Sequence, residues 1–274
     1  MRSIAIINQK GGVGKTTTAV NLSAALAAQG KQVCVIDLDP QAHATLHLSA
    51  SIPESEGSVY QVLMGEASIA DVRRPAGAGL SIVGAHIDLA AVEVELAGTE
   101  GRETILRDRL REDAARYDFA IVDCPPSLGI LTLNALTAVD EVLIPLQPHF
   151  LALHGVSKLL ETIAHISRRL NPRLRLAGVV FCMVDANTKL AGEVIRDVEQ
   201  FLAQARSQAT PWSDACAFQS RIRRNIRLAE APSFGQSILE YAPDSNGAED
   251  YRNLAGELLL ARPQRRPAPT RSVA

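Results

Sequence analysis

The first thirty residues of this chain combine a short apolar run, a glycine-rich loop and a helix-forming segment. The run SIAIIN (residues 3–8) leads into QKGGVGKTTT (9–18), and the helical pattern continues to Gly30. The G-K-T of this loop fits the end of the pattern G-x-x-x-x-G-K-[ST], in which backbone N–H groups and the N-terminus of the following helix bind phosphate. The feature predicts a strand, a P-loop and a helix that together bind a nucleoside triphosphate.

Each part of the loop has an expected role. Glycines let the backbone N–H groups turn inward toward phosphate oxygens. Lys15 is expected to reach the β- and γ-phosphates and so to be catalytic, and the Thr16 hydroxyl is expected to ligate Mg²⁺. The residues expected to contact the nucleotide here are Lys10, Gly11, Gly12, Val13, Gly14, Lys15, Thr16 and Thr17.

Apolar runs alternate with helical patterns along the chain. Buried strands are expected at 3–8, 32–37, 80–84, 118–124, 141–146 and 176–184, and helices at 15–29, 102–116, 129–138, 155–170 and 188–206. This alternation predicts an α/β fold with a doubly wound, mostly parallel sheet covered by helices on both faces. Residues 1–261 are expected to form a single domain, residues 207–215 a surface loop, and residues 262–274 a disordered basic tail rich in proline and arginine.

Two acidic segments follow predicted strands. QVCVIDLDP ends in Asp37 and Asp39, and DFAIVDCPPS contains Asp123 before two prolines. An aspartate at the carboxyl end of a strand beside a P-loop holds the hydration shell of Mg²⁺ in NTPases, and Asp123 fits this role best. Asp39 lies on the loop after its strand, where it is expected to orient the water that attacks the γ-phosphate.

The composition excludes several partner classes. The net charge of −2 gives no overall field for nucleic acid or membrane, so any such contact requires a local patch. The four cysteines are widely spaced and are expected to be thiols in a reducing compartment. No apolar window approaches the length of a transmembrane helix. We therefore expect a cytoplasmic protein with no signal segment.

Several motifs together resemble one family. KGGVGKTT, DLDPQ and DCPPSLGILTLNAL resemble the deviant Walker A, switch I and switch II segments of the ParA/MinD ATPases, and RNIRLAEAPSFGQSILEYAPDSNGAEDY resembles the short chromosomal ParA proteins of the Soj type. The resemblance spans about residues 3 to 260. It implies a Mg²⁺-dependent ATPase that dimerises with ATP, with Lys10 reaching the phosphates of the other subunit in a catalytic role. Lys10 acting within its own chain remains the alternative.

The resemblance has departures. The family usually continues DPQGNAT, whereas this chain has Ala42 and His43; since alanine is less permissive than glycine, the mobility of this segment is expected to differ. His43 and His47 are four residues apart and would share a helix face, although no third metal ligand is evident. Residues 203–220 are about ten residues longer than the family segment.

A basic patch is expected to bind DNA. RIRRNIR carries Arg221, Arg223, Arg224 and Arg227, and nothing in it reads bases, so phosphate contact without sequence preference is expected. The resemblance supports this role, although a second family arginine is Asn187 here, with Lys189 nearby. The alternative is that these arginines pair with acids. The resemblance also places the adenine around Met183 to Asp185 and the segment Asn225 to Pro232, with Met183 and Asn225 as the expected contacts.

The resemblance implies a partition or positioning function. ATP would drive dimerisation, the dimer would coat nucleoid DNA, and a ParB-like or other cargo-bound activator would trigger slow hydrolysis. Two alternatives remain: a MinD-like ATPase, which needs a membrane-binding amphipathic tail, and a NifH-like ATPase, which needs cysteines that hold an Fe–S cluster. The proline-rich tail argues against membrane binding, and Cys124 fits better as part of DCPPS.

Overall fold

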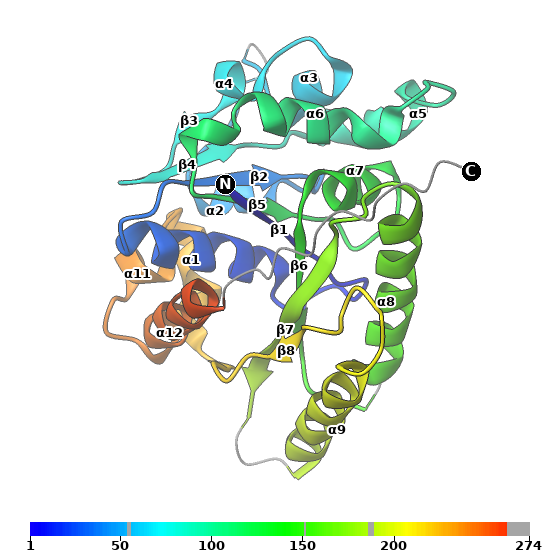
Figure 1. Cartoon of the computed structure of the whole chain (residues 1–274). Helices are drawn as coiled ribbons and strands as arrows, with labels where there is room; N and C mark the ends of the chain where they lie inside the picture. The colour runs from blue at the N-terminus through cyan, green and yellow to red at the C-terminus, as the bar shows by residue number, and fades with distance from the viewer. Residues whose placement is uncertain (54–55, 151, 186–188, 262–274) are drawn as a thin grey trace, which may run out of the picture.

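A computed structural model gives the structure of the chain and describes residues 1–53, 56–150, 152–185 and 189–261 (Figure 1). Within this part, nine strands form one sheet. The strands are β1 (Arg2–Ile6), β2 (Val33–Asp37), β3 (Arg74–Pro75), β4 (Leu80–Val83), β5 (Phe119–Asp123), β6 (Glu141–Leu146), β7 (Arg175–Val184), β8 (Cys216–Ala217) and β9 (Ile222–Arg223).

The strand order is β3-β4-β2-β5-β1-β6-β7-β8, and β9 also pairs with β7. Every pairing is parallel except that of β3 with β4. Because β1 lies at the centre, the loops that follow β2, β5, β1 and β6 meet at one edge of the sheet. In open parallel sheets, ligands bind at the carboxyl ends of the strands, and this edge is such a place.

The central strands are buried on both faces. Along β1, Ile4 and Ile6 belong to one apolar cluster, whereas Ala5 and the following Ile7 belong to the other. This alternation follows from the two-residue period of a strand, and it explains why the strands read as continuous apolar runs instead of alternating polar and apolar residues.

Helices cover both faces (Figure 1). The α-helices are α1 (Lys15–Ala28), α2 (His43–His47), α3 (Val59–Met64), α4 (Ile69–Val72), α5 (Val92–Glu95), α6 (Ile105–Glu112), α7 (Ile130–Ala138), α8 (Ala152–Arg169), α9 (Lys189–Ala205), α10 (Ile226–Glu230), α11 (Ile238–Tyr241) and α12 (Asn246–Leu260). Four 3-10 helices are η1 (Ile87–Ala91), η2 (Arg102–Thr104), η3 (Ala114–Arg116) and η4 (Ala231–Phe234) within the described residues. Helices α1 and α12 pack together on one face, and α6 to α9 follow one another on the other.

The expected α/β architecture is confirmed, and each of the six expected strands is present with ends that differ by at most two residues. The expected helix 102–116 is wrong as one element, because η2, α6 and η3 divide it. The expected surface loop at 207–215 contains turns but no helix or strand.

The sequence pattern assigns no element to the region of α12. Its N-terminus is capped by the Ser245 side chain, which accepts a hydrogen bond from the Ala248 N–H. The buried Tyr251 hydroxyl on α12 lies 3.2 Å from the Thr18 hydroxyl on α1. The C-terminal helix therefore supports the helix that follows the P-loop. Among the described helices, none is both long and apolar enough to cross a bilayer.

Candidate nucleotide-binding site

The P-loop lies between β1 and α1, as its sequence predicts. Gly12 and Gly14 have φ values of 72° and 91°, in the left-handed region that favours glycine, and Gly14 precedes the first residue of α1. Val13 is buried and anchors the loop, whereas Gly11 and Gly12 are exposed. Backbone N–H groups at the N-terminus of a 14-residue helix are therefore available to an anion.

Lys15 is the buried cation of the loop. Its ammonium donates a 3.4 Å hydrogen bond to the carbonyl oxygen of Lys10, so it lies over the loop instead of extending into solvent. Burial lowers the pKa of Lys15, and Asp123 and Asp39 oppose that shift. A buried cation facing two carboxylates is suited to neutralise the charge of a phosphate chain.

Two aspartates at the end of β2 organise the next loop. The Asp37 carboxylate accepts hydrogen bonds from the Thr45 N–H (2.9 Å), the Thr45 hydroxyl (2.7 Å) and the Asp39 N–H (3.1 Å). Asp39 accepts a 2.9 Å bond from the Gln41 N–H. Asp37 thus fixes the backbone of Asp39 and ties α2 to the sheet. Burial raises the pKa of Asp37 to about 6.

Ala42 begins α2 with φ 53° and ψ 32°, a left-handed conformation that glycine adopts without steric cost. The departure from the family sequence at this position therefore places a strained residue beside Asp39. Any movement of α2 that lets Ala42 leave this conformation would relieve the strain.

Asp123 is a buried carboxylate whose two oxygens have no hydrogen-bond partner in the described part of the chain. It is the register neighbour of Asp37 on β2 and of Ile6 at the start of the P-loop. Burial, followed by the neighbouring Asp37 charge, raises the pKa of Asp123 well above its usual range, and the Thr16 hydroxyl opposes this shift. A buried group without a partner implies a missing ligand, and carboxylate and hydroxyl oxygens suit Mg²⁺, so these residues fit a magnesium site.

Lys10 is exposed at the mouth of the loop, and its side chain contacts the Nε2 atom of His149 in the same chain. Its backbone N–H donates to the Asn8 side-chain oxygen at 3.0 Å, and the Asn8 amide donates to the Pro145 carbonyl at 2.7 Å. The loop mouth is therefore tied to the end of β6. His149 and Asn8 are residues that the sequence pattern does not indicate.

The two segments expected to hold adenine lie side by side. The β7–β9 pairing has an irregularity between Cys182 and Val184, and Met183 there has a φ of 53°. The Arg224 N–H donates to the Val184 carbonyl at 3.3 Å, which brings Asn225 close to this bulge. The Cys182 sulfur lies 3.8 Å from the Thr18 hydroxyl, so the bulge also adjoins α1. The Asn225 side chain itself caps α10 by accepting from the Arg227 N–H.

The four arginines of the basic patch differ in their partners. Arg223 binds Asp250 and Glu249, each at 2.6 Å, and these partners raise its pKa. Arg227 binds Glu230 at 2.8 Å, and Arg221 lies 3.7 Å from Glu199. Arg224 is exposed and has no carboxylate partner among the described residues. Three of the four arginines, Arg221, Arg223 and Arg227, are therefore paired with acids, as the alternative expects. Asn187 lies outside the described residues.

His43 and His47 do share the short helix α2, but their surroundings differ. His43 is exposed, whereas His47 is 2% exposed and its Nε2 atom has no partner in the described structure. Burial lowers the pKa of His47 to about 4. The two rings therefore do not face a common ligand from equivalent positions. No group of three potential metal-binding side chains occurs within the described residues.

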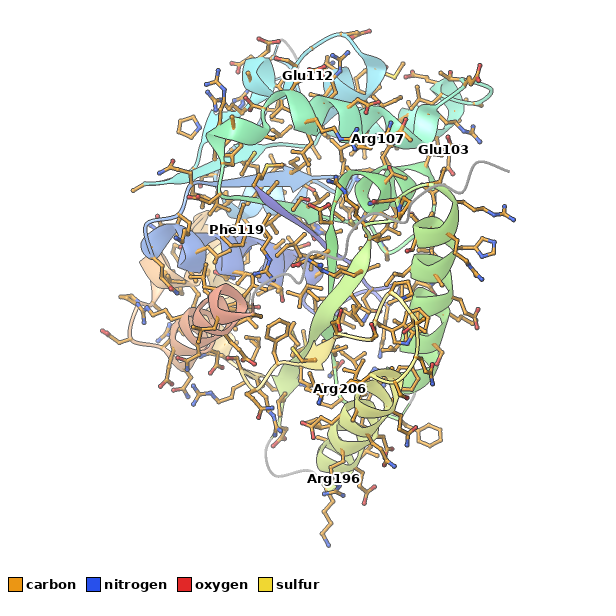
Figure 2. All side chains as sticks on the ribbon, in the orientation of Figure 1. Glu103, Arg107, Glu112, Phe119, Arg196 and Arg206 are labelled. Carbon is orange, nitrogen blue, oxygen red and sulfur yellow. The ribbon has the colours of Figure 1, made fainter. Side chains whose placement is uncertain are left out.

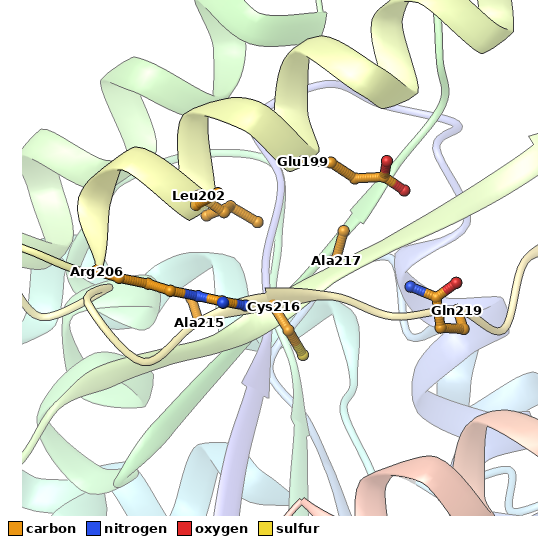
Figure 3. Close-up of a pocket in the computed structure, with 8 residues that line it drawn as sticks. Glu199, Leu202, Arg206, Ala215, Cys216, Ala217 and Gln219 are labelled. Atoms are coloured by element: carbon orange, nitrogen blue, oxygen red, sulfur yellow. The ribbon is translucent and has the colours of Figure 1, made fainter.

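Residues 203–220 do not form a simple loop. They include the end of α9 and the edge strand β8, which pairs with β7. A cavity of about 270 Å³ lies between them, lined among others by Glu199, Arg206, Cys216 and Gln219 (Figure 3). Arg196 lies on α9 and Arg206 directly follows it, at the opposite end of the molecule from Arg107 and Glu112 on α6 (Figure 2).

The thiols are free, and Cys34, Cys124 and Cys182 are buried. Burial raises the pKa of Cys124 well above its ordinary value, so this thiol stays protonated next to the site. Cys34 and Cys124 belong to one apolar core cluster, and Cys182 belongs to the other.

Proteins that place such a loop between a central parallel strand and a helix, with aspartates at the ends of the adjoining strands, are P-loop nucleoside triphosphatases, and this chain is one of them. A model of the AAA domain matches residues 1–176. The chain is 44% identical over 256 residues to the sporulation initiation inhibitor protein Soj of Bacillus subtilis, with 93% of this chain and 97% of the relative covered. It is also 44% identical to the chromosome-partitioning ATPase Soj of Thermus thermophilus, over 94% of this chain and 96% of that protein.

Among solved structures, a cobyrinic acid a,c-diamide synthase from Mycobacterium smegmatis with bound ATP analogue and magnesium superposes with a TM-score of 0.78 at 36% identity, covering 94% of each chain. The chain therefore belongs to the Soj/ParA family of chromosome-partitioning ATPases, and the resemblance found in its motifs is confirmed.

Proposed function

We propose that this protein is a partition ATPase that dimerises with ATP, binds DNA without sequence preference as the dimer, and releases DNA on hydrolysis. The observation that carries the proposal is the unpartnered Asp123 carboxylate beside Lys15 and Asp39 at the mouth of the P-loop. The related structure with an ATP analogue and magnesium supports the same ligands here. We prefer partition to the amidation in that protein's name because both Soj relatives are more similar to this chain.

The residues divide the chemistry as follows. The N–H groups of Gly11 to Thr17 and the Lys15 ammonium bind the phosphates, and the Thr16 hydroxyl and Asp123 would hold Mg²⁺. Mg²⁺ held by these two residues would neutralise negative charge on the phosphates. Asp39 orients the attacking water. Its backbone N–H donates a hydrogen bond to the Asp37 carboxylate, which holds the Asp39 backbone in place. Met183 and Asn225 are proposed to contact the adenine base.

Lys10 supplies a second cation. Lys15 already serves the phosphates of its own chain, and Lys10 is exposed at the loop mouth, so a second subunit placed face to face would bring it to the other nucleotide. A cation positioned where charge develops during bond cleavage accelerates the reaction. ATP bound between two subunits would then hold them together, and hydrolysis would release them.

Changing Lys10 and Asp39 separates dimerisation from turnover. The Asp39→Ala protein is expected to form dimers with ATP and Mg²⁺ and to lose hydrolysis by about 100-fold or more, since the water is no longer oriented. The Lys10→Ala protein is expected to stay monomeric because the trans contact is absent. Light scattering gives the masses, and phosphate release gives the rates.

Lys189→Ala, which alters an exposed lysine at the start of α9, is the matched control and should behave as the unaltered protein. An unchanged mass for the Asp39→Ala protein with and without ATP and Mg²⁺ would reject the dimer model. Dimers formed equally well by the Lys10→Ala protein would instead reject only the trans role of this lysine.

DNA binding is proposed for the segment Arg221 to Arg227, with Arg224 as its main phosphate contact. Arg224 is exposed without a carboxylate partner in the described residues, whereas Arg223 is committed to Asp250 and Glu249. Arg221 and Arg227 have exposed partners, and exposed ion pairs are weak enough to exchange for DNA phosphates. Arginines of residues 262–274, which lie outside the described residues, would add positive charge.

Arg224→Ala is expected to weaken dimer binding to DNA for every sequence and to lower the salt slope by about 1, because one phosphate contact is lost. Arg223→Ala is expected to change stability more than DNA affinity, since it leaves the buried Asp250 carboxylate without the guanidinium that neutralises it. Fluorescence anisotropy at several salt concentrations measures the slopes. Equal slopes for the Arg224→Ala and unaltered proteins would remove this surface from the proposal.

We also propose a cytoplasmic, nucleoid-associated location, one ATPase domain over residues 1–261, and a ParB-like or other cargo-bound protein that stimulates slow hydrolysis. A long-lived ATP state suits a cycle in which a partner sets the time of release. The sequence of residues 262–274 contains three prolines, which disfavour the amphipathic helix that would hold a MinD-like ATPase at a membrane. Pelleting with liposomes distinguishes these two functions.

A further inference from the structure

The Lys10–His149 contact joins two loops that are 139 residues apart in sequence. Lys10 belongs to the P-loop after β1, and His149 to the loop between β6 and α8. The two strands are parallel neighbours, so their following loops meet at the same edge of the sheet. No carboxylate in the described part of the chain forms an ion pair with Lys10. Within the described residues, the Lys10 ammonium therefore has the His149 imidazole as its polar partner.

Both ends of the contact are held by other bonds. On the Lys10 side, Asn8 accepts from the Lys10 N–H and donates to Pro145, which joins the P-loop to β6. On the other side, the His149 carbonyl accepts a 2.9 Å bond from the Ala152 N–H at the start of α8. His149 is half-buried, whereas Lys10 is exposed. The backbone of His149 is thus held in place, and the more exposed lysine side chain is the partner that can move.

The chemistry of the two groups decides which one donates the hydrogen bond and which one accepts it. An ammonium group has only donors, so the Nε2 atom of His149 must accept, and the proton of the neutral ring must lie on Nδ1. A lysine side chain that donates to its own chain at this point does not at the same time extend across an interface to the phosphates of a second subunit. The two positions of Lys10 exclude each other.

We propose that His149 is a positioning residue that holds Lys10 against its own subunit until a nucleotide-bound second copy of this chain competes for the ammonium. The Lys10–His149 contact lies within one subunit and does not depend on the proposed function. Its effect on dimerisation does rest on the proposed function. A binding-competent form that is a fraction of the population raises the apparent dissociation constant by the reciprocal of that fraction. His149 thereby sets how readily ATP dimerises the protein.

The direct test is the protonation pattern of His149 in the nucleotide-free protein. Two-bond ¹H–¹⁵N correlation spectra, recorded at mildly alkaline pH where a free imidazole is neutral, separate an accepting Nε2 from a protonated one. The expected result is an Nδ1–H tautomer in the unaltered protein and a shift toward Nε2–H in Lys10→Ala. Identical His149 signals in the two proteins would overturn the proposal.

The second test measures dimerisation with ATP and Mg²⁺ in proteins that carry Asp39→Ala to stop turnover. His149→Ala is expected to tighten the dimer by about fivefold to twenty-fivefold, because a held form of roughly four-fifths of the subunits leaves about one-fifth competent, a factor that enters once or twice. His149→Gln, whose side-chain oxygen still accepts from Lys10, is expected to restore the original dissociation constant. A tighter dimer with glutamine as well as alanine would contradict the proposal.

His165→Ala, on the exposed surface of α8, is the matched control and should leave dimerisation unchanged. The two tests also separate the two proposals. If ATP causes no dimerisation in any variant, the proposed function fails while the nucleotide-free spectra still decide the role of His149. If dimers form but the spectra do not respond to Lys10→Ala, this inference alone fails.

Discussion

Asp123→Asn is expected to lower Mg²⁺-dependent ATP hydrolysis by about 100-fold or more and, at the same time, to make the nucleotide-free protein more stable. The first effect follows from the loss of the carboxylate that would hold the metal with Thr16. The second follows because both Asp123 oxygens are buried next to Asp37 and have no hydrogen-bond partner among the residues that the structure describes. We expect a gain of roughly 1 kcal/mol in the unfolding free energy at neutral pH, or about 2–4 °C in Tm.

The sign of this stability change follows from the pKa. Burial raises the pKa of Asp123 in the folded protein, so the folded state prefers the protonated acid while the unfolded chain ionises near pH 4. Stability from this group is present at acidic pH and is lost as the pH rises toward the folded-state pKa. Asparagine removes the charge and therefore removes this loss.

Thermal unfolding with and without ATP and Mg²⁺ measures both effects. Asp214→Asn changes an exposed carboxylate in the loop at 207–215 and should alter neither hydrolysis nor Tm. An Asp123→Asn protein that hydrolyses ATP at the normal rate, or that unfolds at a lower temperature without nucleotide, would show that Asp123 has a structural partner instead of a metal.

His47 is expected to make the protein sensitive to acid. Burial lowers its pKa to about 4 in the folded state, while an unfolded histidine titrates near 6.5. The unfolded chain therefore takes up a proton first, and the stability contributed by the neutral ring is lost as the pH falls from about 6.5 to 4. Two to three pKa units correspond to about 3 kcal/mol of unfolding free energy by pH 4.

His47→Leu, which keeps a buried side chain of similar size, is expected to remove most of this loss. His43→Leu, on the exposed side of the same helix, should keep the original acid profile and serves as the control. Urea unfolding at pH 7 and at pH 4.5 measures both, and comparing variants cancels other groups, including Asp37, whose raised pKa acts in the opposite direction. Parallel profiles for the His47→Leu and unaltered proteins would contradict the prediction.

The sheet was predictable because its signal is local. Each central strand is buried on both faces, so its residues form an apolar run that stands out from the helical pattern around it, as SIAIIN does before the P-loop. The divided helix at 102–116 was not predictable in this way. Its middle part packs Leu106 and Leu110 against the core, while η2 and η3 bend the backbone at its ends.

The residues that form hydrogen bonds between distant loops could not be predicted from the sequence. Asn8, His149 and Thr45 have ordinary neighbours in sequence, and their roles come from partners that only the strand order brings near. The same holds for the Arg221 to Arg227 segment. Its charge is visible in the sequence, but the distinction between Arg223 and Arg224 depends on where α12 places Asp250.

The amino-acid order by itself determined the phosphate loop, the acids at the strand ends and the alternation that makes a parallel sheet, because glycine freedom, charge and apolar periodicity act over a few residues. Tertiary structure alone decided that Asp123 has no hydrogen-bond partner in the described part of the chain, that Asp37 bonds to Thr45 and that Lys10 lies against His149. Those outcomes depend on burial and on which strands become neighbours, and both are properties of the whole sheet.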